Sequence, residues 1–177
     1  MMMFIKKGYS VKCLGDNFIK NSPYGDKLQE YGVEVLYGTN LQATLWEYLQ
    51  SNKRNFDYVF LNRPHIACKY IDFIRQNMHT KIVYYGHDLH YMRLQREYDL
   101  MGDDNALNEF KSYRNLEYSL LYKADISYYP SYKEVEEIKK TDESLRVKAI
   151  NAYMFDEKEI FIRDFKNTKN LLFVGGF

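Results

Sequence analysis

The sequence predicts an α/β protein with a Rossmann-like parallel sheet and helices on both faces. Short apolar runs, at residues 58–61 and 82–85 for example, alternate along the chain with longer segments of helical periodicity. The runs are continuous rather than alternating in polarity, which is typical of parallel strands buried on both faces. No internal repeat or low-complexity tract interrupts this order.

Each predicted element rests on its apolar pattern and on the residues that end it. We expect strands at residues 11–14, 33–37, 58–61, 82–85, 126–129, 147–150 and 171–174. We expect helices at residues 1–7, 26–31, 41–49, 64–78, 89–101, 104–123 and 132–140. Gly8, Gly32 and Gly102 stand where helices end, and Pro64 stands where one begins. Ser131 and Glu134 have the spacing of a capping box.

The length of 177 residues suits one domain with a substantial core. We assign residues 1–150 to that domain, and residues 151–177 to a polar linker followed by the first strand of a second domain. A doubly wound sheet normally begins with a strand, whereas this chain begins within a predicted helix. We therefore expect a chain truncated at both ends.

Composition restricts the classes of function. Lysine and arginine number 25 against 24 aspartate and glutamate residues, and this balance argues against nucleic acid as the main partner. No apolar run is long enough for a transmembrane helix. At the N-terminus the apolar residues precede Lys6 and Lys7, the reverse of a secretory signal. We expect a cytoplasmic protein.

Polar side chains gather where the strand at residues 82–85 ends at Gly86. They are His87, Asp88, His90, Arg93 and Arg96. Arg63 and His65 follow the preceding strand in the same way, around Pro64. Ligands bind at the carboxyl ends of strands in open α/β sheets. The free N–H groups of a helix that starts at Pro64 would favour an anion there.

Three interpretations of this cluster stay open on the residues alone. In a ligand site, the imidazoles would bond hydroxyls or phosphates, and Arg93 or Arg96 would add charge-assisted hydrogen bonds. In a metal site, His87, Asp88 and His90 would be the ligands. In a structural interpretation, Asp88 caps the following helix. No glycine-rich phosphate loop and no catalytic triad spacing is present.

Several segments resemble the amino-terminal domain of retaining GT-B-type glycosyltransferases of the group 1 (family 4) class, with rhamnosyltransferase-like members most similar. They are residues 7–11 (KGYSV), 57–65 (DYVFLNRPH), 85–96 (YGHDLHYMRLQR) and 171–177 (LLFVGGF). A further match combines Glu117, Ala124-Asp125, Ser131 and Glu134. The order and spacing hold over nearly the whole chain.

The resemblance implies a two-domain enzyme that transfers a sugar from a nucleotide-sugar donor to a glycan or lipid-linked acceptor, without a cofactor or metal. His87 matches the histidine that reaches the donor sugar. The resemblance places Arg63, His65, Asp88 and Arg96 along the acceptor side or the wall of the cleft. His90 and Arg93 complete the expected substrate-binding set.

The resemblance also implies partners beyond this chain. The carboxy-terminal domain holds most of the nucleotide-sugar, so we expect no sugar transfer by this chain alone. We also expect a location in the cytoplasm or at the inner face of the membrane. The first strand of the family has no counterpart before Met1, so the resemblance further implies a gapped or rearranged sheet, which dimerisation could complete. The alternatives are a metal-dependent hydrolase using His87, Asp88 and His90, and a non-catalytic α/β ligand-binding module.

Overall fold

The computed structural model describes residues 1–102 and 104–150, so the expected linker and the expected strand at 171–174 lie outside the described residues. The elements follow in the order α1 (Met2–Lys6), β1 (Val11–Leu14), α2 (Tyr24–Glu30), β2 (Val33–Leu36), α3 (Thr39–Ser51), β3 (Tyr58–Asn62), α4 (Pro64–Asn77), β4 (Lys81–Tyr85), α5 (His90–Met101), α6 (Asp104–Lys123), β5 (Ile126–Tyr129), α7 (Tyr132–Thr141) and β6 (Val147–Ala149). The expected boundaries of these elements agree with the structure within two residues.

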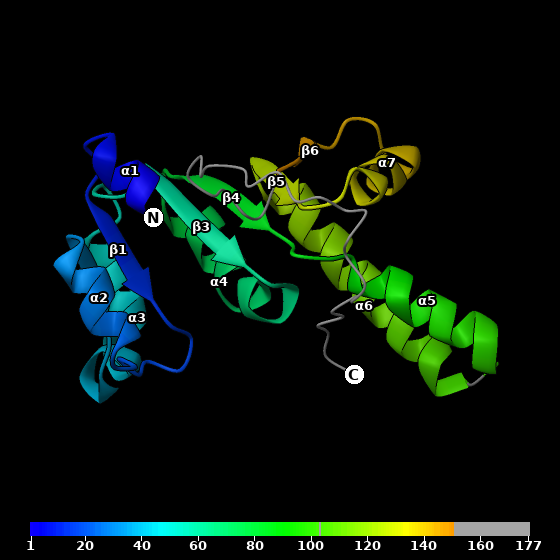
Figure 1. Ribbon diagram of the computed structural model, residues 1–177, viewed down its shortest axis with the longest axis horizontal. Coiled ribbons are helices and arrows are strands. Elements are labelled where there is room, and N and C mark those ends of the chain that lie inside the picture. The colour runs from blue at the N-terminus through cyan, green and yellow to red at the C-terminus, as the bar shows by residue number, and fades with distance from the viewer. Residues whose placement is uncertain (103, 151–177) are drawn as a thin grey trace, which may run out of the picture.

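All paired strands run parallel, which confirms the predicted α/β class. One sheet has the order β3-β4-β5-β6, and a second sheet pairs β1 with β2. In the larger sheet Tyr58 is opposite Lys81, and Asn62 is opposite Tyr85. This register brings the carboxyl ends of β3 and β4 to one edge (Figure 1).

The expectation of a gapped sheet is also confirmed. β1 and β3 lie next to each other, yet the hydrogen-bonded ladders place them in separate sheets (Figure 1). Between β1 and β3 no strand of the described residues is present, so the order of a continuous doubly wound sheet is interrupted there.

Helices lie on both faces of β3. Phe60 contacts Phe4 of α1, with ring centroids 5.2 Å apart. The next residue, Leu61, points to the other face because side chains alternate along a strand. There it joins the main core cluster with Ala67 and Ile71 of α4. The helices α4 and α6 also contact each other and form a layer on this side.

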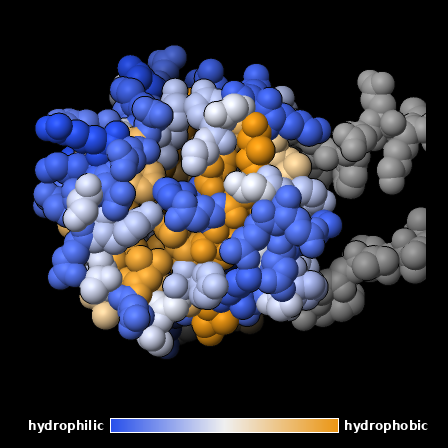
Figure 2. Space-filling view, turned by 90° about the vertical axis from the view of Figure 1, so that its left-hand side faces the viewer, coloured by the Kyte–Doolittle hydropathy of each residue, from blue (hydrophilic) through white to orange (hydrophobic). Residues whose placement is uncertain are grey.

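The main core lies within the larger sheet and its helices. Tyr84, Tyr129, Ile82 and Ile138 are completely buried there. Among the partly buried residues around this cluster, only Leu49 comes from the first 55 residues of the chain. The side of the molecule that carries β1, α2 and α3 shows hydrophobic side chains through the middle of a largely hydrophilic face (Figure 2).

A few side chains attach the β1–β2 part to the larger sheet. Trp46 of α3 packs against Phe73 of α4, with ring centroids 4.7 Å apart. Asp16, just after β1, accepts hydrogen bonds from Lys69 and from the Tyr70 hydroxyl, each at 2.7 Å. Two independent types of contact therefore fix β1 beside α4. No helix in the described part of the chain is long and apolar enough to cross a membrane.

Gly86 is required at the end of β4 because Tyr129 occupies the space where a side chain would begin. A Cβ on Gly86 would lie 2.3 Å from two ring carbons of Tyr129 and 2.6 Å from its hydroxyl oxygen. The Tyr129 ring is completely buried, so it has no free space into which to move. Close packing, rather than an unusual backbone angle, selects glycine here.

We predict that Gly86→Ala lowers the free energy of unfolding by about 1–3 kcal/mol, the usual cost of overpacking a core. Chemical denaturation measures this. Gly15→Ala is the matched control, because its new Cβ would meet only the flexible Asn17 side chain, at 3.1 Å. In a Tyr129→Ala background the Gly86→Ala cost should fall. An equal cost in both backgrounds would contradict the contact.

Candidate functional site

Backbone hydrogen bonds hold three strand ends level at the edge that carries the candidate residues. The Arg63 N–H donates to the Tyr85 carbonyl at 3.2 Å. The Gly86 N–H donates to the Tyr128 carbonyl at 3.1 Å. The segments that follow β3 and β4 are therefore neighbours, as the sequence predicted for parallel strands.

Arg63 and His87 share an unusual backbone conformation at these two adjacent strand ends. Arg63 has φ 64° and His87 has φ 68°, in the region that residues other than glycine seldom adopt. Each such residue costs of order 1 kcal/mol and persists only where its surroundings hold it. Pro64, buried at the first position of α4, fixes the chain directly after Arg63. Two strained residues side by side mark this edge as a candidate site.

His87 is exposed but not fully hydrated. Its ring packs edge-on against Tyr85, with centroids 4.4 Å apart and planes at 64°. Partial burial and the Arg63 guanidinium lower the pKa of His87, and the Asp88 carboxylate opposes this change. The imidazole is therefore neutral at physiological pH, with one nitrogen able to donate and the other to accept a hydrogen bond.

A buried carboxylate holds the start of α5. Glu117 of α6 is completely buried. It accepts hydrogen bonds from the N–H groups of His90 at 2.9 Å and Tyr91 at 3.1 Å. Burial raises the pKa of Glu117, and these backbone donors work against the rise. The carboxylate thus satisfies two N–H groups that a helix leaves unpaired at its N-terminus.

Glu134 of α7 holds the preceding residue in a similar way. It accepts a hydrogen bond from the Leu89 N–H at 2.8 Å and also one from the Ser131 N–H. Burial raises the pKa of this carboxyl. Half of the predicted capping box is therefore confirmed. The other half is wrong, because the Ser131 side chain makes no capping hydrogen bond.

The structural interpretation of Asp88 as a helix cap is also wrong. The residue before α5 is Leu89, and no side chain at that position caps the helix. Carboxylates from α6 and α7 do this instead, which leaves Asp88 half exposed beside His87. The loop from Gly86 to Leu89 is consequently fixed at its end by Glu117 and Glu134, while the side chains of His87 and Asp88 are exposed.

His90 makes contacts inside the protein, and its expected role in substrate binding stays a prediction. Its Nδ1 lies 3.3 Å from Glu117 Oε1 and 3.5 Å from Asp88 Oδ1. The ring stacks on Tyr113 with the planes only 8° apart. With 19% of its side chain exposed, His90 supports the loop rather than presenting itself to a ligand.

The other predicted residues are distributed around the edge. His65 lies exposed on the first turn of α4. Arg93 and Arg96 lie exposed on α5, and Arg96 interacts electrostatically with Glu134. Arg63, His87 and Asp88 therefore form the compact part of the candidate site, with the other side chains further out.

The metal interpretation finds no support in this geometry. Across residues 1–102 and 104–150, no three histidine, cysteine, aspartate or glutamate side chains converge to hold a metal ion. His90 Nδ1 lies within 3.5 Å of both Asp88 and Glu117, whereas the ring of His87 packs against Tyr85. The three proposed ligands therefore do not share one coordination sphere.

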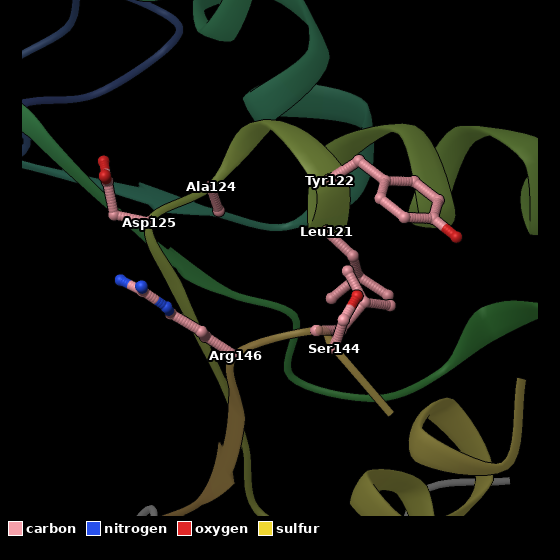
Figure 3. A pocket seen from close by; sticks show the side chains of 7 residues that line it. Leu121, Tyr122, Ala124, Asp125, Ser144 and Arg146 are labelled. Carbon is pink, nitrogen blue, oxygen red and sulfur yellow. The ribbon is translucent and has the colours of Figure 1, made fainter. Parts of the chain in front are cut away.

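A small pocket exists at the opposite edge of the sheet, where β5 and β6 begin. It is lined by Leu121, Tyr122, Ala124, Asp125, Ser144, Leu145 and Arg146 (Figure 3). Asp125 is already engaged there. It accepts hydrogen bonds from the Ile82 N–H at 2.8 Å and from Arg75 at 2.9 Å. Burial would raise the pKa of Asp125, but these donors lower it. Its carboxylate therefore links β4 and α4 to the start of β5, and these bonds occupy it within the protein.

Comparison with known proteins identified no similar protein. No protein-family model matches the chain, and neither the curated proteins nor the solved structures contain a match. The description of the site therefore rests on the geometry given above.

We predict that Glu117→Gln lowers the free energy of unfolding by about 1–3 kcal/mol, because one of the two backbone donors loses its acceptor inside the protein. Urea denaturation measures the change. Glu109→Gln, exposed on the same helix, is the matched control and should be nearly neutral. Equal stability of the two variants would show that the bonds to His90 and Tyr91 contribute little.

We predict that Arg63→Gln raises the pKa of His87 part of the way to the ordinary histidine value, because partial burial persists after the charge is removed. Imidazole NMR titration measures this, and Arg54→Gln is the control for a remote exposed arginine. The lowered pKa of His87 also makes the stability of the protein depend on pH. As pH falls through about 6.5, the unfolded chain takes up the proton first, so the His87 contribution to stability decreases. An unchanged pKa in Arg63→Gln would refute the pairing.

Proposed function

We propose that this chain is the acceptor-side domain of a retaining GT-B-type glycosyltransferase. In this proposal its partners are a nucleotide-sugar donor and a glycan or lipid-linked acceptor. The observation that carries the proposal is the pairing of Arg63 with His87 on two adjacent strand ends, in a doubly wound α/β sheet. The motif resemblance and the strand order, with β2-β1 on one side of the gap and β3-β4-β5-β6 on the other, support it.

The chemistry of the edge suits a phosphorylated sugar. Arg63 supplies positive charge directly before α4, whose first N–H groups also favour an anion. The neutral imidazole of His87 can exchange hydrogen bonds with sugar hydroxyls. Asp88, with 51% of its side chain exposed, offers a further acceptor for a hydroxyl. This combination supports recognition of a polar, anionic donor.

The proposed reaction replaces the diphosphate on the anomeric carbon with an acceptor oxygen, and the new bond forms on the same face of the sugar. The transition state resembles an oxocarbenium ion, as in other glycosyl transfers. His87 would bond the sugar and hold it in position. A second domain, proposed to begin with residues 171–177, would bind the nucleotide and stabilise the leaving phosphates, so this chain alone should not turn over. The reaction would take place in the cytoplasm or at the inner face of the membrane.

We predict that nucleotide-sugars shift the NMR signals of His87 and of the residues around Arg63 when UDP-glucose, GDP-mannose or dTDP-rhamnose is titrated into the protein. His87→Ala should weaken the responding nucleotide-sugar about tenfold, equivalent to about 1.4 kcal/mol. His79→Ala is a matched control, because His79 is an exposed histidine at the other end of β4 and should leave binding unchanged.

The same titration separates the alternatives. A response of His87 to glycans but to no nucleotide-sugar would limit this chain to the acceptor. Stoichiometric binding of zinc at His87 and His90, without any response to sugars, would favour the hydrolase and contradict the proposal. Absence of every response at His87 would remove this residue from the site.

A further inference from the structure

The side chain of His90 lies between a buried carboxylate and an exposed one. Its Nδ1 is 3.3 Å from Glu117 Oε1 and 3.5 Å from Asp88 Oδ1. The Glu117 side chain is completely buried, whereas 51% of the Asp88 side chain is exposed. One nitrogen of a single imidazole therefore faces an acceptor inside the protein and another at its surface.

The ring of His90 is fixed in direction. It stacks on Tyr113 with centroids 5.5 Å apart and planes 8° apart. Its backbone is also fixed, because Glu117 accepts a hydrogen bond from the His90 N–H at 2.9 Å. Since Nδ1 faces two carboxyl oxygens, this nitrogen carries the hydrogen and donates it. A carboxylate behind an imidazole commonly sets the tautomer and the orientation of the ring in this way.

Glu117 does not need the imidazole in order to have hydrogen-bond donors. Its Oε1 accepts from the His90 N–H, and its Oε2 accepts from the Tyr91 N–H at 3.1 Å. Both oxygens of the buried carboxylate are thus already bonded to the backbone. The hydrogen on Nδ1 of His90 is therefore available to the exposed carboxylate of Asp88.

A second charged group acts on the same carboxylate of Asp88. Burial raises the pKa of Glu134, and the negative charge of Asp88 adds to this increase. The two carboxylates therefore repel each other, while the Nδ1–H group of His90 attracts Asp88. Together these interactions favour one orientation of the Asp88 side chain beside His87.

We propose that His90 is a positioning residue, which holds the Asp88 carboxylate in one orientation so that Asp88 accepts a hydrogen bond from a sugar hydroxyl. The nature of the ligand rests on the proposed function, whereas the orientation of Asp88 does not. An acceptor fixed in advance binds more tightly than a freely rotating one, because its rotational entropy is lost before the ligand arrives. Glu117 thus influences the surface of the protein through His90.

The orientation of Asp88 can be measured in the free protein. Three-bond NMR couplings from its carboxyl carbon to its backbone nitrogen and carbonyl carbon report the χ1 angle, and we expect the values of a single staggered rotamer. His90→Gln should give averaged couplings, because the glutamine amide lies near the former position of Nε2. His90→Asn should keep the original couplings, because the asparagine amide can donate from the position of Nδ1.

The variants include a matched control. His79→Gln changes an exposed histidine just before β4 and should leave the Asp88 couplings unchanged. Both variants at position 90 should fold, because the bonds from Glu117 to the N–H groups of His90 and Tyr91 do not involve the imidazole.

Ligand binding tests the use of the oriented carboxylate. The probe is a nucleotide-sugar that shifts the His87 signal, compared with its free nucleoside diphosphate. His90→Gln should weaken the nucleotide-sugar about threefold to tenfold, the effect of one hydrogen bond, and leave the diphosphate unchanged. In an Asp88→Ala background, His90→Gln should have no further effect, because His90 acts through Asp88.

Several results would overturn the proposal. They are unchanged Asp88 couplings in His90→Gln, equal averaging in His90→Asn and His90→Gln, and a full effect of His90→Gln in the Asp88→Ala background. Equal weakening of the nucleotide-sugar and the diphosphate would show that His90 only supports the loop. The expected couplings without binding of any nucleotide-sugar would refute the proposed function and the sugar hydroxyl, and would establish the orientation of Asp88 alone.

Discussion

The interaction on which the candidate site depends is the bond between a buried carboxylate and the start of a helix. Complete burial of the Glu117 carboxyl group is unfavourable, and its hydrogen bonds to the first N–H groups of α5 offset that cost. Glu134 fixes the residue before them. The loop that carries His87 can therefore keep an unfavourable backbone conformation, because its far end has no freedom to relax. Removal of either carboxylate would therefore affect the backbone geometry of His87, although neither carboxylate contacts this residue.

Much of the fold could be predicted because each helix and strand is indicated by residues close together in the sequence. Continuous apolar runs such as residues 82–85 can only be buried on both faces, and this indicates a parallel sheet. Pro64 gave the start of α4 correctly, since its ring suits the first helical turn. The gap in the sheet was expected from the family resemblance, because the first strand of that family has no counterpart in this sequence. The need for glycine at position 86 could not be predicted, because it arises from contact with Tyr129, forty-three residues later in the chain.

The neighbouring positions of the candidate residues were predictable, but the contacts of their side chains were predictable only in part. Two strand ends in one parallel sheet must meet at one edge, which brought Arg63 and His87 together. The direction of His90 was missed, because it depends on a carboxylate of another helix. Ser131 and Glu134 show the same limit. Their spacing predicted a local cap, whereas the bond from Glu134 to Leu89 joins residues that are distant in sequence.

The divided sheet has a consequence for the order in which the molecule assembles. Apart from Leu49, the main core cluster and its partly buried neighbours come from residues 56–147, so this part can collapse around its own apolar surface. The first two strands add no residue to that cluster and attach through a small number of aromatic and polar contacts. Because few contacts join them to the main core, we expect them to open at a lower free energy than the larger sheet, which faster amide hydrogen exchange in β1 and β2 would show.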